Sequence, residues 1–343
     1  MTALRPAIAV SMGDPLGIGP EVTIKALASL RQKDGPQIRI YGESHALHAA
    51  ADRASIEPFW WRVRHDFPHL DTTSVHDVLL LDYPEFEDAA RPAPGPSRLA
   101  GEASFRFVDD AIADARRPEH DPRRVAGIVT APISKEAWAL AGHKQFPGHT
   151  ELLAARFAAR RVRMMFVAPR LRVMLVTAHI PLMTLGDVLS IGRVSDTIDL
   201  AHEACRQLGV ERPRVAVCGL NPHAGEAGLL GHEDSKIIEP AIRMAVERGV
   251  AATGPHPADT IFNAALKGHH DIVVAMYHDQ GLIPVKLLAF DSAVNVTIGL
   301  PAVRTSPDHG TAFDIAGKSL ADPGSMRAAI AHAQLLLRSA PSA

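Results

Sequence analysis

Short hydrophobic runs alternate with stretches of helical periodicity along almost the whole chain. The runs are five or six residues long and contain few charged residues, which is typical of strands buried on both faces of a parallel sheet. The strands predicted in this way are 7–11, 38–42, 78–82, 125–130, 172–177, 214–219 and 272–276.

Amphipathic segments separate these runs. In 102–116, for example, Phe105, Val108, Ile112 and Ala115 fall on one face of a helix. The helices predicted in this way are 20–31, 102–116, 149–161, 193–208 and 235–249. Regular alternation of strands and helices predicts an α/β fold with mostly parallel sheets, and 343 residues are enough for two such domains. The Pro- and Gly-rich stretch 83–98 is either an interdomain linker or a long surface loop.

Composition narrows the class of protein without identifying a function. Hydrophobic residues make up 47% and charged residues 22%, as in ordinary globular domains, and the net charge of −2 argues against a nucleic-acid surface. Cys205 and Cys218 form no CxxC pair and are expected to be buried thiols in a reducing compartment. We find no signal-peptide pattern and no apolar run long enough to span a membrane, so we expect a cytoplasmic protein.

Polar clusters follow five of the predicted strands. In open parallel sheets, ligands bind beyond the carboxyl ends of the strands. A composite site at this edge is therefore the leading hypothesis. The clusters are "SMGDPLGIGPE" (11–21), "TAPISK" (130–135), "TAHIPL" (177–182), "NPHAGEAGLLG" (221–231) and "YHDQG" (277–281).

Three of these clusters each contain one histidine, namely His179, His223 and His278. Three neutral imidazoles can hold a divalent ion and leave coordination positions open for a substrate. The alternative is that each is an ordinary hydrogen-bonded histidine. If they bind a metal, Glu226 and Asp279 are the candidate acids to orient the rings.

Other polar residues suggest an anion site. Gly148, His149 and Thr150 begin a predicted helix, where unpaired N–H groups can bind a phosphate or carboxylate, although Thr150 would also be an ordinary N-cap. Lone polar groups in apolar surroundings need a partner, which can be an anionic ligand or an internal salt bridge. The polar residues that have such apolar neighbours in the sequence are Lys135, Lys286, Asn295 and Arg304.

The chain contains no GxGxxG motif. After Gly17 and Gly19, Val22 stands where the third glycine would be, so a Rossmann nucleotide site is not supported.

Taken together, the motifs resemble the PdxA family, the 4-hydroxythreonine-4-phosphate dehydrogenases of vitamin B6 biosynthesis. The resemblance runs nearly end to end and includes "GDPLGIGPE", "TAPISK", "GHTE", "NPHAGE", "GPHPADT", "MYHDQGLIPVK" and "VNVTIGLPAVRTSPDHGTAFDIAGKS". The last of these is also similar to a loop of isopropylmalate and isocitrate dehydrogenases, which bind NAD(P) without a Rossmann fold. Leu16 and the "GKSLAD" segment depart from the family pattern, but neither touches a proposed ligand.

The resemblance implies two α/β/α domains with an active site in the cleft between them, at a homodimer interface. The implied first domain is 1–125 with 301–343, which would carry the cofactor loop, and the second is 126–300. It also implies one divalent metal ion, Zn²⁺, Co²⁺, Mn²⁺ or Mg²⁺, bound by His179, His223 and His278, with at least one ligand from the partner subunit.

The same resemblance implies the other contacts of the site. Substrate contacts would come from His149, Thr150, Lys286, Asn295 and Arg304, and NAD or NADP would bind the loop around His309, Gly310 and Asp314. A general base is needed for the hydroxyl proton, and Lys135, Asp279 or a water can serve.

The expected reaction is oxidation of 4-phosphohydroxy-L-threonine at C3 to a β-keto acid that loses CO₂. Relatives that oxidise threonate or erythronate 4-phosphate, or diol carboxylates, share these motifs, so the substrate stays open. A metal-dependent hydrolase or lyase with the same three histidines is the alternative from another class, and a non-catalytic binding protein is disfavoured because every candidate ligand is present.

Overall fold

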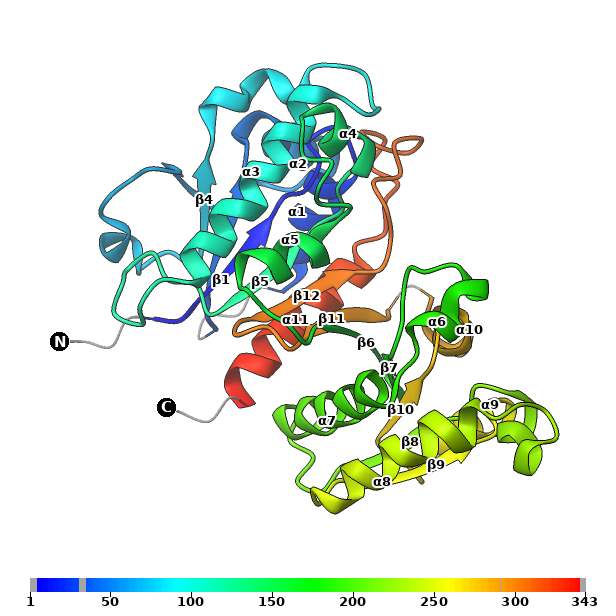
Figure 1. Ribbon diagram of the computed structural model, residues 1–343. Coiled ribbons are helices and arrows are strands. Elements are labelled where there is room, and N and C mark those ends of the chain that lie inside the picture. The colour runs from blue at the N-terminus through cyan, green and yellow to red at the C-terminus, as the bar shows by residue number, and fades with distance from the viewer. Residues whose placement is uncertain (1–4, 31–34, 291, 340–343) are drawn as a thin grey trace. The chain divides into compact units, whose positions relative to one another are not determined.

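The computed structural model describes residues 5–30, 35–290 and 292–339 (Figure 1). The chain divides into two compact units, Met1–Ala159 with Leu300–Arg338 and Arg160–Gly299 with Ser339–Ala343. The sequence placed residues 126–159 in the second domain, which is wrong. Strand β5 (Gly127–Thr130) pairs with the first strand of the chain, so this segment belongs to the first unit. The stretch 83–98 also lies inside the first unit, as a loop with a short helical turn, and is not an interdomain linker.

The first unit is built on parallel strands. The hydrophobic runs predicted as strands account for most of them, and every residue of the two central strands β1 and β2 is buried. The strand order is β3 (Trp61–Arg64), β4 (Val78–Asp82), β2 (Gln37–Gly42), β1 (Ala7–Ser11), β5 and β12 (Val303–Pro307).

Helices bury their apolar faces against this part of the sheet. The four apolar residues predicted to share a helix face in 102–116 are all buried, which confirms that helix. The helices of the unit are α1 (Gly19–Ser29), α2 (Ser44–Arg53), α3 (Arg98–Ala115), α4 (Lys135–Leu140), α5 (His149–Arg156) and α11 (Gly324–Ser339), with 3₁₀ turns η1 (Leu70–Thr73) and η2 (Pro84–Ala90).

The second unit has its own strands, in the order β11 (Val294–Ile298), β6 (Arg163–Ala168), β7 (Leu171–Leu175), β10 (Ile272–Ala275), β8 (Arg214–Cys218) and β9 (Ala251–His256). Strand β6 runs antiparallel to β11 and β7, and the other pairs are parallel. The prediction of a mostly parallel α/β structure is therefore confirmed.

Helices of the second unit pack on both faces of these strands. One face packs against α9 (Ala258–Leu266) and α10 (His278–Ala289) in a single apolar cluster. Helix α7 (Ile191–Gln207) contacts β8 and β10, and packs beside α8 (Glu239–Glu247). The remaining helical segments are α6 (Leu185–Val188), the 3₁₀ segments η3 (Leu182–Thr184) and η4 (Pro222–Gly228), and the π-turn η5 (Asp234–Ile238).

Two further expectations can be checked against the described residues. Cys205 and Cys218 are buried free thiols, as predicted, and burial raises the pKa of Cys205 to about 11 and that of Cys218 to about 12. Among the helices that the structure describes, none has the length and hydropathy needed to cross a bilayer.

Candidate functional site

Two predicted polar loops meet at the carboxyl edge of the first unit. Ser11 and Thr130 are register partners at the ends of β1 and β5, and the loop after β1 is fastened to the loop after β5 by Asp14 N–H donating to Pro132 C=O at 2.9 Å. The Asp14 carboxylate is fully buried and accepts from the Leu16 N–H at 2.9 Å. Burial raises its pKa to about 6, although backbone hydrogen bonds from Leu16 and Ser134 oppose the shift. Asp14 therefore fixes the "GDPLGIG" loop.

Arg304 projects from the adjacent strand β12 into the same region. Its side chain is only 3% exposed, and its Nη2 donates to Thr130 Oγ1 at 2.7 Å. Burial lowers the pKa of Arg304 to about 10, a shift that the charge of Glu151 partly offsets. A guanidinium at this depth remains charged at neutral pH and favours an anion beside it.

His149 and Lys135 share the electrostatic field of Arg304. His149 is partly exposed, but its Nε2 is buried and makes no hydrogen bond to the described part of the chain. Burial, then the charges of Arg304 and Lys135, hold the pKa of His149 well below its usual range. Lys135 Cε lies 3.8 Å from the position that a Cβ on Gly148 would take, which places it at the start of α5. The structure thus brings three of the predicted anion contacts together.

Thr150 lies at the second position of α5, where the sequence left open an ordinary N-cap. The N-cap is Gly148, a residue without a side chain that could cap the helix. The capping alternative is therefore wrong. Thr150 is half-buried and follows His149 in α5, so its hydroxyl can join the anion contacts of His149, Lys135 and Arg304.

The predicted cofactor loop packs against the "GDPLGIG" loop. Thr311 C=O accepts from Ile18 N–H at 2.9 Å, and a Cβ on Gly17 would come within 3.1 Å of the Thr311 Cβ. Farther along, Lys25 on α1 donates to the carbonyls of Ser319 and Ala321 at 2.9 and 3.1 Å. His309 is half-buried, whereas Gly310 and Asp314 are exposed.

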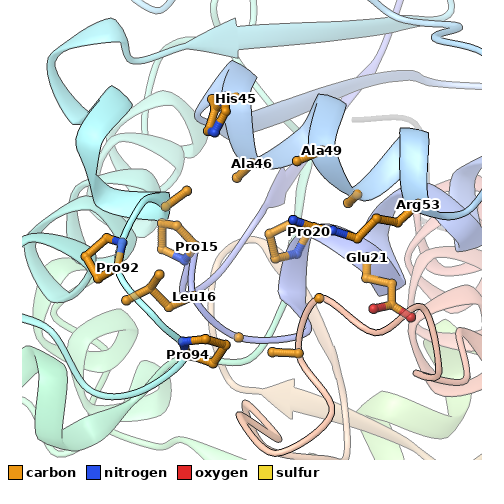
Figure 2. A pocket seen from close by; sticks show the side chains of 15 residues that line it. Pro15, Leu16, Pro20, Glu21, His45, Ala46, Ala49, Arg53, Pro92 and Pro94 are labelled. Carbon is orange, nitrogen blue, oxygen red and sulfur yellow. The ribbon is translucent and has the colours of Figure 1, made fainter.

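A pocket opens beside this loop, and Figure 2 shows the residues around it. Pro15 and Leu16 lie near Pro92 and Pro94, while Arg53 and Glu21 lie on another side. Ala316 and Gly317, just after the predicted cofactor residues, complete the lining. Most of the lining side chains are apolar, and Glu21, His45 and Arg53 add polar groups to them.

In the second unit, two of the three predicted metal ligands are neighbours. The ring centroids of His179 and His278 are 5.6 Å apart. His278 lies at the start of α10, and its Nδ1 is 2.7 Å from Asp279 Oδ1. A carboxylate that holds Nδ1–H leaves the Nε2 lone pair available for a metal ion. His179 and His278 are therefore suited to bind a divalent ion together.

His223 lies in η4, on a left-handed turn. His223, Ala224, Gly225, Glu226 and Ala227 all have positive φ, from 45° to 80°. Non-glycine residues in this region cost of order 1 kcal/mol each, and such strain is concentrated at functional sites.

The buried Asp234 carboxylate holds the start of this turn. It accepts from the N–H groups of Leu220 and Asn221 at 2.8 and 3.1 Å and from Asn221 Nδ2 at 2.9 Å. His223 itself is exposed. Within residues 5–30, 35–290 and 292–339, no three His, Cys, Asp or Glu side chains are grouped as for a metal ion, so the structure does not bring His223 to the other two.

The two other predicted substrate contacts also lie in the second unit. Asn295 is in the middle of β11 and is 8% exposed. Lys286 is half-buried on α10, and its Nζ lies 5.0 Å from the centroid of the Phe290 ring.

The sequence reasoning missed four residues that shape these loops. Asp14, Thr130 and Asp234 were not singled out, although the first two belong to quoted motifs. Gln280, quoted with the polar cluster after β10, is buried: its Oε1 accepts from Met276 N–H at 2.7 Å and its Nε2 donates to Gly219 C=O at 2.8 Å. Its role is therefore to join two loops. The only sign of this role in the sequence was that Gln280 is a polar residue close to the predicted ligand His278.

Comparison with known proteins gives matches along most of the chain. A family model described as pyridoxal phosphate biosynthetic protein PdxA matches residues 36–333. A 4-hydroxythreonine-4-phosphate dehydrogenase from Beijerinckia indica subsp. indica is 43% identical over 337 residues, covering 98% of this chain and 96% of its own. A D-threonate 4-phosphate dehydrogenase from Cupriavidus necator is 43% identical over 336 residues, covering 96% and 97%.

A solved structure is similar as well. The 4-hydroxythreonine-4-phosphate dehydrogenase from Klebsiella pneumoniae has a TM-score of 0.83 and 40% identity, with 98% of this chain and 99% of that chain covered. This likeness confirms the predicted α/β fold class, which is not a Rossmann fold.

His149 makes stability depend on pH in a defined direction. Because its folded pKa is depressed, the unfolded chain binds more protons once pH falls below the ordinary histidine value of about 6.5. The free energy of unfolding should therefore fall as pH is lowered from 7 to 5, by at most about 1.4 kcal/mol per pH unit from this residue. His149→Gln should flatten the dependence in urea titrations, while His120→Gln, at an exposed position, should leave it unchanged. Equal slopes for wild type and His149→Gln would contradict the depressed pKa.

Asp234 should be required for the turn that carries His223. Asp234→Ala leaves the N–H groups of Leu220 and Asn221 without their acceptor, and we expect a loss of about 3 kcal/mol or more in the free energy of unfolding. Glu233→Gln is the matched control, because Glu233 bonds only the Asn221 side chain and lies near the surface; its loss should stay below about 1 kcal/mol. If both variants unfold at the same denaturant concentration, Asp234 does not anchor the turn.

Proposed function

The chain belongs to the PdxA family, and from this membership we propose that it oxidises 4-phosphohydroxy-L-threonine with NAD or NADP in pyridoxal 5′-phosphate biosynthesis. The observation that carries the proposal is the 43% identity, over 98% of this chain, to a 4-hydroxythreonine-4-phosphate dehydrogenase. An oxidoreductase is the class that this relationship supports.

The first unit supplies the groups for the substrate phosphate. Arg304 is a buried permanent cation with one hydrogen bond to Thr130, and Lys135 adds a second positive charge nearby. Burial, and then these two charges, lowers the pKa of His149, so the ring is neutral at physiological pH and its buried Nε2 can hydrogen-bond to a phosphate without adding charge. Thr150 adds a hydroxyl at the start of the same helix. Lys286 and Asn295 of the second unit are proposed as further contacts to the substrate.

The second unit supplies imidazoles for a divalent ion. His179 and His278 lie side by side, Asp279 orients the ring of His278, and His223 is held on a strained turn. We propose that these three are the metal ligands and that at least one of the three at each metal ion is supplied by the partner subunit. Zn²⁺, Co²⁺, Mn²⁺ and Mg²⁺ remain candidates. When bound, the metal lowers the pKa of the substrate's C3 hydroxyl, and the nicotinamide accepts the hydride.

The proposed cofactor contacts are His309, Gly310 and Asp314. They precede Ala316 and Gly317, which line the pocket of Figure 2. We propose that the proline, leucine and alanine side chains of that pocket contact a nucleotide base or nicotinamide ring.

The contacts of Asp279 and Lys135 narrow the choice of general base. Asp279 is already engaged with His278 Nδ1 at 2.7 Å, which favours an orienting role. Lys135 is exposed and lies near His149, and because it serves there as a cation, a water that Lys135 holds is the proposed proton acceptor.

We also propose a homodimer. Helix α10, which begins with His278, exposes Ile283, Leu287, Leu288 and Phe290, with Leu287 83% and Phe290 69% exposed. Large apolar side chains gathered on one helix are typical of a surface covered by a partner. Light scattering of the purified protein should give the mass of two chains, and Leu287→Glu should shift it toward one. Leu140→Glu, on a leucine of α4 that is 53% exposed, should not. A single-chain mass for the wild type would contradict the dimer.

A second substrate is favoured by a specific observation. A D-threonate 4-phosphate dehydrogenase is as similar to this chain, at 43% identity, as the 4-hydroxythreonine-4-phosphate enzyme. Both substrates carry a 4-phosphate and a hydroxyl at C3, so the same phosphate and metal groups serve either.

A direct assay separates these possibilities. Reduction of NAD and of NADP should be followed with 4-phosphohydroxy-L-threonine, D-threonate 4-phosphate and D-erythronate 4-phosphate, with each metal added after chelation. We expect metal-dependent reduction of one nicotinamide cofactor with the first substrate. Rapid oxidation of only the second or third would assign the chain to the sister activity, and metal-dependent bond cleavage without nicotinamide reduction would favour the hydrolase or lyase.

Arg304→Gln serves as the site control in this assay. Loss of a charged hydrogen-bond donor should raise the KM for the phosphorylated substrate by about tenfold to a hundredfold, with a smaller effect on kcat. Arg91→Gln, at an exposed arginine of the same unit, should leave KM unchanged. If Arg304→Gln also leaves KM unchanged, Arg304 does not bind the phosphate.

A further inference from the structure

A second pocket opens at the amino edge of the first unit's strands, opposite the edge that carries the loops described above. It has a volume of about 330 Å³, at the lower end of the range for small-molecule sites. Ala7, Gln37 and Ala126 line it at or just before the starts of β1, β2 and β5. Three arginines, Arg5, Arg39 and Arg124, also line it.

Arg39 is the unusual member of this group. It lies within β2 and is only 5% exposed, so its guanidinium is buried. Its Nε donates to Gln37 Oε1, a neutral acceptor, at 2.9 Å, and its buried Nη1 has no hydrogen-bond partner among the described residues. Burial lowers the pKa of Arg39. A buried cation of this kind costs several kcal/mol unless a negative charge accompanies it.

The carboxylates whose charges act on Arg39 are the buried Asp114 and the half-buried Asp121, which also lines the pocket, and both are engaged with other groups. Asp114 accepts from the Tyr41 hydroxyl at 2.7 Å and is paired with Arg117 and Arg123. Asp121 is paired with Arg117 at 3.0 Å. No carboxylate in the described parts of the chain lies within salt-bridge distance of Arg39.

The other charged groups of the lining leave room for an anion. Arg5 pairs with Asp77 at 2.8 Å, and Arg124 donates to the Arg117 carbonyl at 2.6 Å. Neither of these partners is a carboxylate of the pocket lining, so both guanidiniums have further N–H groups that can donate to an anion. Asp71 and Glu119 of the lining are exposed at the rim, where water solvates them.

We propose that this amino-edge pocket binds an oxyanion, the phosphate group of a small phosphorylated metabolite or free phosphate, with Arg39 Nη1 as its buried donor. Planar guanidinium groups match the oxygen geometry of phosphate, and three of them around one pocket supply the charge that a dianion needs. The site is separate from the proposed active-site residues of this unit, which lie at the carboxyl edge. A bound anion would stabilise the folded unit by mass action.

Isothermal titration with inorganic phosphate at constant ionic strength tests the site. Wild type should show two classes of site, one lost in Arg304→Met and the other weakened at least about tenfold in Arg39→Met. Arg64→Met, at an exposed arginine paired with Asp66, is the matched control and should bind as wild type. Methionine keeps the length of the side chain, so Arg39→Met removes the charge while filling its space.

Wild-type crystals grown with tungstate give a test that needs no variant. We expect anomalous density within hydrogen-bond distance of Arg39 Nη1. A water molecule or the Asp71 carboxylate at that atom, with no tungstate, would overturn the proposal, as would unchanged phosphate binding in Arg39→Met.

Titration with glycerol 3-phosphate then distinguishes the two sources of the anion. Binding at least tenfold tighter than that of inorganic phosphate supports a phosphorylated metabolite, and equal or weaker binding supports free phosphate.

Discussion

The burial of the Arg304 guanidinium is the constraint that organises the candidate anion site of the first unit. A charged side chain that is only 3% exposed needs polar partners. Thr130, at the end of β5, accepts a hydrogen bond from the Arg304 guanidinium. Its field then acts on its neighbours: together with Lys135 and burial, it holds the pKa of His149 well below the usual range. Arg304 therefore contributes to the charge of the site and, after burial, to keeping the histidine beside it neutral.

Buried polar side chains play a corresponding part in the second unit, as connectors of loops. Asp234 accepts three hydrogen bonds from the segment that precedes His223, and Gln280 joins the end of β10 to the Gly219 carbonyl. The residues that would touch a metal ion are exposed or half-buried, whereas Asp234 and Gln280, which join the loops that carry them, are buried. Rigid support under accessible ligands is what a preorganised site requires.

The sequence predicted the elements well because their causes are local. Continuous apolar runs specified seven of the twelve strands that the structure describes, and the stripe through Phe105 and Ile112 specified α3. The strands β3, β6, β9, β11 and β12 were not predicted. The domain boundary at residue 125 was wrong because strand pairing is not local: nothing between 126 and 159 shows that β5 lies beside β1. The same limit applies to the site. Polar residues at strand ends marked the loops, but the hydrogen bonds of Asp14 and Asp234 depend on segments brought together only by folding.

Arg39 and Arg304 are two buried arginines within strands, and the sequence treated them differently. Both are lone cations in apolar strands, and both are at least 95% buried by the exposed fractions of 5% and 3%. The sequence reasoning singled out Arg304 and passed over Arg39, although the physical requirement for a partner is the same at both. What separates them is which end of the strand they approach: Arg304 lies next to Thr130 at the carboxyl end of β5, where ligands of open sheets are expected, and Arg39 lines a pocket at the amino ends. A buried charge indicates a need for a counter-charge wherever it lies, so the amino edge of the first unit has the same physical reason to bind an anion as the carboxyl edge.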